Sequence, residues 1–168
     1  MLNAASQARS VDGGMTVPAA IRLAWGTWLF LGMLPFLLFV YVVWSLVNSE
    51  TAVAHSEGAM TWFAIAAGYL LAMVPISFFW RSYLFRAYWS GEPVKPEKYL
   101  FGMISMWLAL VIGGVFSLLG CLRYHSLLPD LFPALVAFVF FMIMWPSGQA
   151  MIRKVGNASD PSVYQEPR

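Results

Sequence analysis

Four long stretches without a charged residue restrict what this chain can fold into. A helix of about 20 apolar residues crosses the hydrocarbon core of a bilayer, because each residue adds a rise of about 1.5 Å. Every one of the four stretches reaches that length. The pattern therefore predicts an all-α membrane protein with four transmembrane helices in a small antiparallel bundle, spanning about residues 23–47, 60–80, 99–122 and 131–152.

The overall composition agrees with a chain that lies mostly in lipid. Apolar residues make up 60% of it and charged residues only 11%, whereas soluble domains are about a quarter charged. The length of 168 residues allows one transmembrane domain (residues 23–152), flanked by a polar N-terminal tail (1–22) and a polar C-terminal tail (153–168). A net charge of only +2 gives no broad basic surface, so we expect no nucleic-acid partner.

The distribution of Lys and Arg predicts the orientation. Short loops on the cytoplasmic side of membrane proteins are enriched in basic residues. With both termini in the cytoplasm, nine of the ten Lys and Arg residues fall on that side, and only Arg123 falls outside. The sequence therefore predicts a multi-pass protein of the cell's inner (plasma) membrane with both termini cytoplasmic.

A cleaved signal peptide is the alternative interpretation of the first apolar stretch. Ala52, Val53 and Ala54 form a small-x-small pattern after it, as at a signal cleavage site. The apolar region of a secretory signal is about 7–15 residues long, and this stretch is longer, which favours a retained helix.

Small residues recur at every fourth position in the second and third stretches. Such stripes let helix backbones approach closely in lipid, where apolar burial gives little drive for association. We expect the second and third helices to pack through them, although a stripe can also face another subunit. The predicted packing residues are Ala64, Gly68, Ala72, Ser105, Ala109, Gly113 and Ser117.

The connection from Arg81 to Lys98 is the largest predicted cytoplasmic feature between helices. It combines four basic residues (Arg81, Arg86, Lys95 and Lys98) with aromatic ones, a mixture typical of the lipid headgroup level. These four residues are candidates for docking a partner protein or an anionic lipid. The alternative is that their charges only orient the helices.

The sequence offers little for catalysis or for binding a cofactor. The four stretches contain no Asp, Glu, Lys, Arg or His, which argues against a proton relay or a haem ligated by two histidines. The single Cys121 excludes an internal disulfide. Both histidines and three of the acidic residues lie in the predicted outer loops, with no known metal-site spacing: Glu50, His55, Glu57, His125 and Asp130. We therefore expect no catalytic site, metal or cofactor.

The favoured function is an accessory or assembly subunit of a larger membrane complex, with the bilayer and other membrane subunits as partners. A small oligomeric channel or transporter for a neutral or small solute is the alternative. It would need polar side chains along its path, for which Thr27, Ser77, Ser105, Ser117 and Gln149 are the candidates. A membrane enzyme that uses the outer His and carboxylate residues is less favoured.

Overall fold

The computed structural model describes residues 15–48 and 57–151, which form a bundle of helices without any strand in those ranges. The elements follow one another as α1 (Val17–Val47), α2 (Glu57–Leu84), the single turn α3 (Arg86–Trp89), α4 (Pro96–Tyr124), α5 (Leu131–Ile143) and the 3-10 turn η1 (Gln149–Met151). The chain is all-helical in the described ranges, as the sequence predicts.

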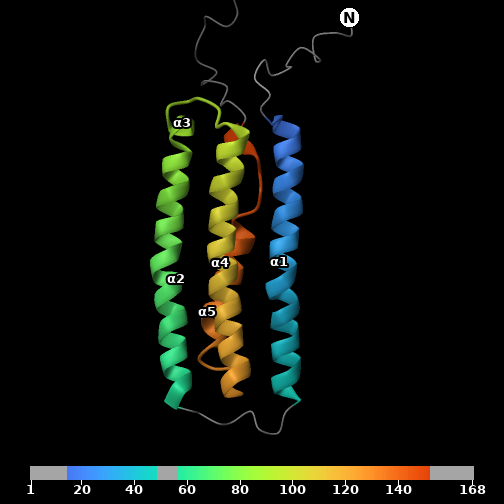
Figure 1. Cartoon of the computed structure of the whole chain (residues 1–168), viewed down its shortest axis with the longest axis vertical. Coiled ribbons are helices and arrows are strands. Elements are labelled where there is room, and N and C mark those ends of the chain that lie inside the picture. The colour runs from blue at the N-terminus through green and yellow to red at the C-terminus, as the bar shows by residue number, and fades with distance from the viewer. Residues whose placement is uncertain (1–14, 49–56, 152–168) are drawn as a thin grey trace, which may run out of the picture.

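Helix α4 is the centre of the bundle. Figure 1 shows α1 and α2 on either side of it, with α5 behind. In the most apolar window of α4, 61% of the residues are buried, compared with 17% in α1 and in α2. Helices α1 and α2 therefore expose most of their apolar side chains, and α4 supplies the surface on which the others pack.

Three helices (α1, α2 and α4) are long and apolar enough to cross a membrane. Helix α5 has only 13 residues, and the predicted fourth helix (131–152) stops at Ile143. Pro146 explains the early end, because proline lacks the N–H that would bond the carbonyl of Met142 and disfavours helical geometry at the preceding residue. The predicted count of four membrane-spanning helices is thus not confirmed.

The other helix ends follow from local sequence. Helix α1 begins at Val17 and has Pro18 in its first turn, so it starts inside the range predicted as a polar tail. Both α1 and α2 continue through an internal proline, Pro35 and Pro75. The chain turns after α3 at Gly91, whose φ of 84° suits a residue without a side chain.

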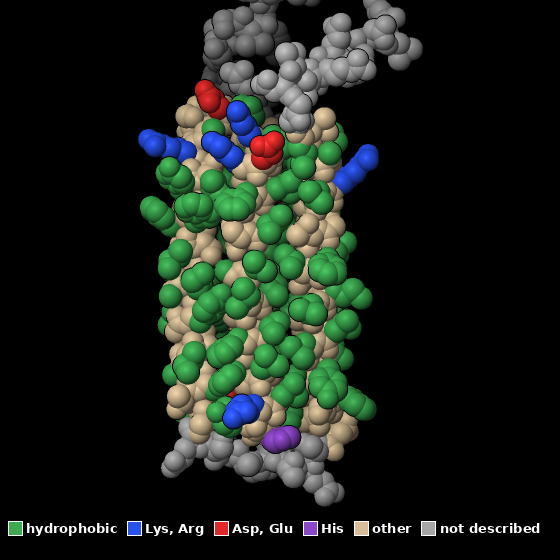
Figure 2. Space-filling view, viewed as in Figure 1, with side chains coloured by type: hydrophobic (Ala, Val, Ile, Leu, Met, Phe, Trp, Pro, Cys, Tyr) green, Lys and Arg blue, Asp and Glu red, His purple; other side chains and the backbone are tan. Residues whose placement is uncertain are grey.

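The surface has an apolar middle and charged ends. In Figure 2, hydrophobic side chains cover the middle of the visible face, while Lys and Arg gather mainly at the end that carries α3. Aromatic and aliphatic residues such as Phe30, Leu71 and Phe79 are more than three-quarters exposed. Such a surface suits a lipid environment.

Candidate functional site

After α5, the chain continues through irregular backbone and the 3-10 turn η1 toward the start of α4. The backbone N–H of Gly148 donates to the hydroxyl oxygen of Tyr99 across 3.1 Å. The N–H of Val94, just before α4, donates to the carbonyl of Ala150 across 3.0 Å. These bonds hold residues 144–151 (the return segment) against the end of the bundle where α2 finishes.

Two tryptophans satisfy carbonyls near the broken end of α5. The indole Nε1 of Trp28 in α1 donates to the carbonyl of Phe141 across 3.3 Å. The indole Nε1 of Trp107 in α4 donates to the carbonyl of Met144 across 2.8 Å. A helix end leaves its last carbonyls without partners, and in a non-aqueous setting side chains must supply the donors. Trp28 and Trp107 therefore offset the cost of ending α5 at Ile143, because they donate hydrogen bonds to carbonyls that would otherwise lack a partner.

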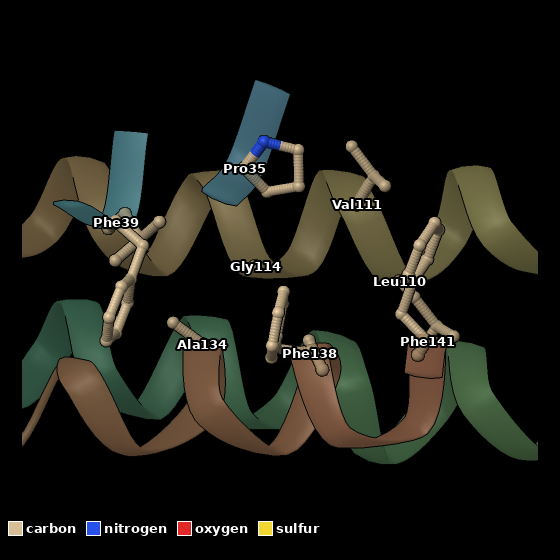
Figure 3. A pocket seen from close by; sticks show the side chains of 10 residues that line it. Pro35, Phe39, Leu110, Val111, Gly114, Ala134, Phe138 and Phe141 are labelled. Carbon is tan, nitrogen blue, oxygen red and sulfur yellow. The ribbon is translucent and has the colours of Figure 1, made fainter. Parts of the chain in front are cut away.

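The interior where α1, α4 and α5 meet is closely packed. Figure 3 shows Pro35 and Phe39 from α1, Gly114 from α4 and Phe138 from α5 around a small apolar space. Its volume is about 20 Å³, which leaves room for no more than a water molecule. This space is a packing defect and not a ligand site.

A larger and partly polar cavity lies between α2, α3, α4 and the return segment. We call it the Arg81 pocket; its volume is about 290 Å³. It is lined by Arg81, Ser82, Phe85, Tyr88, Trp89, Tyr99, Met103, Trp145, Ser147, Gln149 and Ala150. It therefore combines one cation with aromatic walls and a few neutral polar groups.

The Arg81 guanidinium is short of partners. Its Nε is buried and donates no hydrogen bond to any described residue. One terminal nitrogen, Nη1, makes a weak contact of 3.7 Å with the sulfur of Met144, and Cζ lies 5.0 Å from the centre of the Phe85 ring. No carboxylate in the described ranges forms an ion pair with it. The pocket thus holds a half-buried positive charge that has no acidic counterpart among the described residues.

An apolar groove runs along the seam between α2 and α5, which we call the α2–α5 groove. Its volume is about 320 Å³. It is lined by Phe63, Ala67, Leu70, Leu71, Val74, Pro75, Phe132, Pro133, Val136 and Phe140. The groove and the Arg81 pocket follow the same seam, because both have α2 on one side and α5 or its continuation on the other.

The structure separates the four basic residues predicted to dock a partner or lipid. Arg81 faces the pocket, whereas Arg86, Lys95 and Lys98 are exposed and do not line it. The sequence offered no signal for this division, because Arg81 becomes enclosed only when the return segment folds back along α4.

The two small-residue stripes do not face each other. On α4, Ala109, Gly113 and Ser117 are buried and Ser105 is half-buried, with its hydroxyl donating to the carbonyl of Gly102. On α2, the whole stripe (Ala64, Gly68 and Ala72) is exposed, and a Cβ added at Gly68 would meet nothing within 4 Å. The prediction that the two stripes pack against each other within this chain is therefore wrong.

Helix α2 instead packs through positions that recur at intervals of seven and four. Its buried residues are Ala59, Ala66, Leu70 and Ser77. Ala66 and Gly68 are two positions apart, so they lie about 200° apart around the helix, almost on opposite sides. The buried set also contains small residues, which made the two faces hard to distinguish by residue type.

Large side chains of α2 fill the spaces that glycines of α4 leave open. A Cβ at Gly113 would clash with the side chain of Leu70, and one at Gly120 would clash with the indole of Trp62. Trp62 also stacks on Phe116 with 4.3 Å between ring centres, and its Nε1 donates to the Phe116 carbonyl across 3.0 Å. At the interface between α2 and α4, large side chains of α2 therefore pack over glycines of α4. The spacing of small residues alone did not predict this arrangement.

The opposite end of the bundle contains a buried acid. The side chain of Asp130 is fully buried, and neither of its carboxyl oxygens has a hydrogen-bond partner in the described chain. Burial raises the pKa of this carboxyl to about 6. The backbone carbonyl of Asp130 accepts a hydrogen bond from Ser117, which ties the start of α5 to α4.

The candidate outer-loop ligands do not form a metal centre in the part of the chain that is described. Within it, no group of three His, Cys, Asp or Glu residues is arranged to hold a metal ion. Glu50 and His55 lie outside the described residues, Glu57 begins α2, and His125 is exposed at the end of α4.

The polar residues considered for a channel are scattered. Ser77 and Ser117 are buried, Thr27 and Ser105 are half-buried on different helices, and of the five only Gln149 lines the Arg81 pocket. They do not line one path through the chain.

Comparison with known proteins identified no matching family, no similar curated protein and no similar solved structure.

Proposed function

We propose that this chain is a non-catalytic, multi-pass protein of the inner (plasma) membrane that serves as an accessory or assembly subunit of a larger membrane complex. In this proposal four segments cross the bilayer and both termini are cytoplasmic. The fourth segment consists of α5 and the return segment. The end that carries Arg81, Arg86, Lys95 and Lys98 faces the cytoplasm, as the basic-residue distribution indicates.

The dimensions of the fourth segment support a crossing. Thirteen helical residues cover about 20 Å at about 1.5 Å per residue. The following five residues (144–148) add at most about 16 Å, and less because the N–H of Ser147 turns back to the carbonyl of Trp145. The fourth segment can therefore extend through a hydrocarbon core of about 30 Å to the headgroup level. Non-helical backbone at this depth needs protein around it, and Pro146 and Gly148 are both buried.

The observation that carries the partner proposal is the outward stripe of α2. Ala64, Gly68 and Ala72 form a shallow track on the side of α2 opposite α4, with nothing above Gly68. Exposed Ile65 and Leu71 flank this track. In lipid, a helix associates most closely where small residues let two backbones approach, so we assign this face to a transmembrane helix of a partner subunit.

The experiment compares two glycine substitutions on exposed helix faces. Gly68→Leu fills the track, whereas Gly26→Leu fills an equally open position on α1. Tagged full-length protein is purified in mild detergent, and the complex is measured by native mass spectrometry and by identifying the bound membrane proteins. We expect one membrane protein to co-purify in fixed stoichiometry with the wild type and with Gly26→Leu, and to be lost with Gly68→Leu.

Two outcomes contradict the proposal. Equal recovery of the partner with both variants would show that the track is not the interface. Isolation of the wild type as a monomer, without any protein in fixed stoichiometry, would remove the subunit assignment. Loss of folding is monitored in parallel by thermal unfolding, which the open position of Gly68 predicts to be unchanged.

A further inference from the structure

We propose that the Arg81 pocket and the α2–α5 groove together bind one anionic phospholipid, with its phosphate on Arg81 and an acyl chain in the groove. This site adjoins the outward track of α2, with Leu71 between the two, and it does not depend on the subunit assignment.

The positive charge of Arg81 requires an anionic partner. A half-buried guanidinium loses much of its hydration, and this cost is offset only when an anion and hydrogen-bond acceptors replace the water. Within the described chain the guanidinium contacts a methionine sulfur and an aromatic ring, and Tyr99 interacts with its charge, but none of these is a carboxylate. A guanidinium is a planar fork of N–H donors that can bind phosphate through two parallel hydrogen bonds, and in Arg81 the Nε donor has no partner among the described residues.

The surroundings place this cation at headgroup level. Trp80, Tyr83, Trp89 and Trp145 are exposed around the end of the bundle that holds Arg81. Tryptophan and tyrosine are enriched where the hydrocarbon core meets the polar headgroups, and arginines there reach toward phosphate. A lipid phosphate is thus available at the depth of the pocket.

The apolar groove supplies a matching site for a chain. Pro75 in the groove and Arg81 in the pocket are six positions apart, which is about 9 Å along α2. Met144, which contacts Arg81, follows Phe140 of the groove and precedes Trp145 of the pocket in the chain. From Phe63 to Pro75 the groove follows about 18 Å of helix, close to the depth of one leaflet of a core about 30 Å thick.

This combination favours a lipid over a free anion. Inorganic phosphate would satisfy Arg81 but leave the apolar groove unused. A neutral lipid would fill the groove but leave the guanidinium without a net negative partner. An anionic phospholipid satisfies both cavities at once.

The test uses purified full-length protein in mild detergent, titrated separately with phosphatidylglycerol, phosphatidylcholine and inorganic phosphate. Binding is measured by native mass spectrometry. We expect phosphatidylglycerol to bind at least about tenfold more tightly than phosphatidylcholine, a ratio that corresponds to about 1.4 kcal/mol. Arg81→Gln should remove this preference, whereas Arg86→Gln, which changes an exposed arginine outside the pocket, should keep it.

A second variant leaves Arg81 unchanged and obstructs the groove. Ala67 lines the groove, so Ala67→Phe should weaken binding of long-chain phosphatidylglycerol, whereas Ala19→Phe on the exposed face of α1 should not. The proposal is overturned if Arg81→Gln and Ala67→Phe both bind phosphatidylglycerol like the wild type, or if phosphatidylcholine binds equally well. Full displacement of the lipid by millimolar inorganic phosphate would overturn it in favour of a free-anion site.

Discussion

The indole N–H of Trp107 and the carbonyl of Met144 lie 2.8 Å apart in a hydrogen bond that replaces one lost from α5. In an unbroken helix the N–H of Gly148 would donate to that carbonyl. Here Gly148 donates to the Tyr99 hydroxyl instead, so α4 supplies a new partner for each half of the missing bond. The return segment is therefore held in place by two side chains of α4.

Trp107→Phe should destabilise the bundle. The change keeps an aromatic ring but leaves the Met144 carbonyl without its donor, and an unsatisfied buried polar group costs about 1–3 kcal/mol. The measurement is equilibrium unfolding in detergent. Trp44→Phe is the control, because Trp44 is 67% exposed and should tolerate the change. Equal effects of the two substitutions would mean that the bond at Met144 contributes no stability.

Glycines on α4 and α2 should respond differently to leucine. Gly113 faces the side chain of Leu70, and overpacking of this kind typically costs about 1–3 kcal/mol. Gly68→Leu should leave the free energy of unfolding of the isolated chain nearly unchanged, since the added side chain points into open space. Detergent unfolding of both variants checks this difference. If Gly68→Leu is as destabilising as Gly113→Leu, the outward face of α2 is wrongly assigned.

Stability should fall as pH rises through the titration of Asp130. Burial raises the pKa of this carboxyl from 3.8 to about 6, so the folded state binds more protons than the unfolded state between those values. The free energy of unfolding should thus decrease from about pH 4 to about pH 6 and then level off. At about 1.4 kcal/mol per pH unit, the upper limit of the change is about 3 kcal/mol.

Asp130→Asn tests the assignment of that pH dependence. An amide cannot ionise, so the fall in stability between pH 4 and pH 6 should largely disappear in this variant. Glu92→Gln, at an exposed position after α3, should retain it. A wild-type profile that is flat over this range would contradict the buried position of Asp130.

Opposite ends of the bundle should be accessible from opposite sides of the membrane. Single cysteines are introduced in a Cys121→Ser background at Ser90, beside α3, and at His125, after α4; both positions are exposed. An impermeant thiol reagent added to intact cells should label His125→Cys and spare Ser90→Cys until the membrane is opened. The reverse pattern would invert the proposed orientation, and labelling of both from outside would exclude it.

The sequence by itself determined the helical class, the apolar stretches and the position of the basic connection. Those properties depend on local features: the length of a run without charge, prolines such as Pro18 near helix starts, and a glycine at the turn after α3. These properties could be predicted from the sequence because each depends on residues that are close together in the chain. Helices α1, α2 and α4 contain the first three predicted stretches and extend beyond them, α1 by six residues at its start.

Only the tertiary structure decided which faces pack and how the fourth stretch ends. A helix that is apolar all round has no polar side to mark its exterior, so the stripe of Gly68 was predicted to face the interior, whereas Ala66 on the other side is buried there. The end of α5 at Ile143 combines the local effect of Pro146 with donors from Trp28 and Trp107, which lie far away in sequence. Arg81 belongs to a pocket for the same reason: its walls come from segments that meet only after the chain has folded.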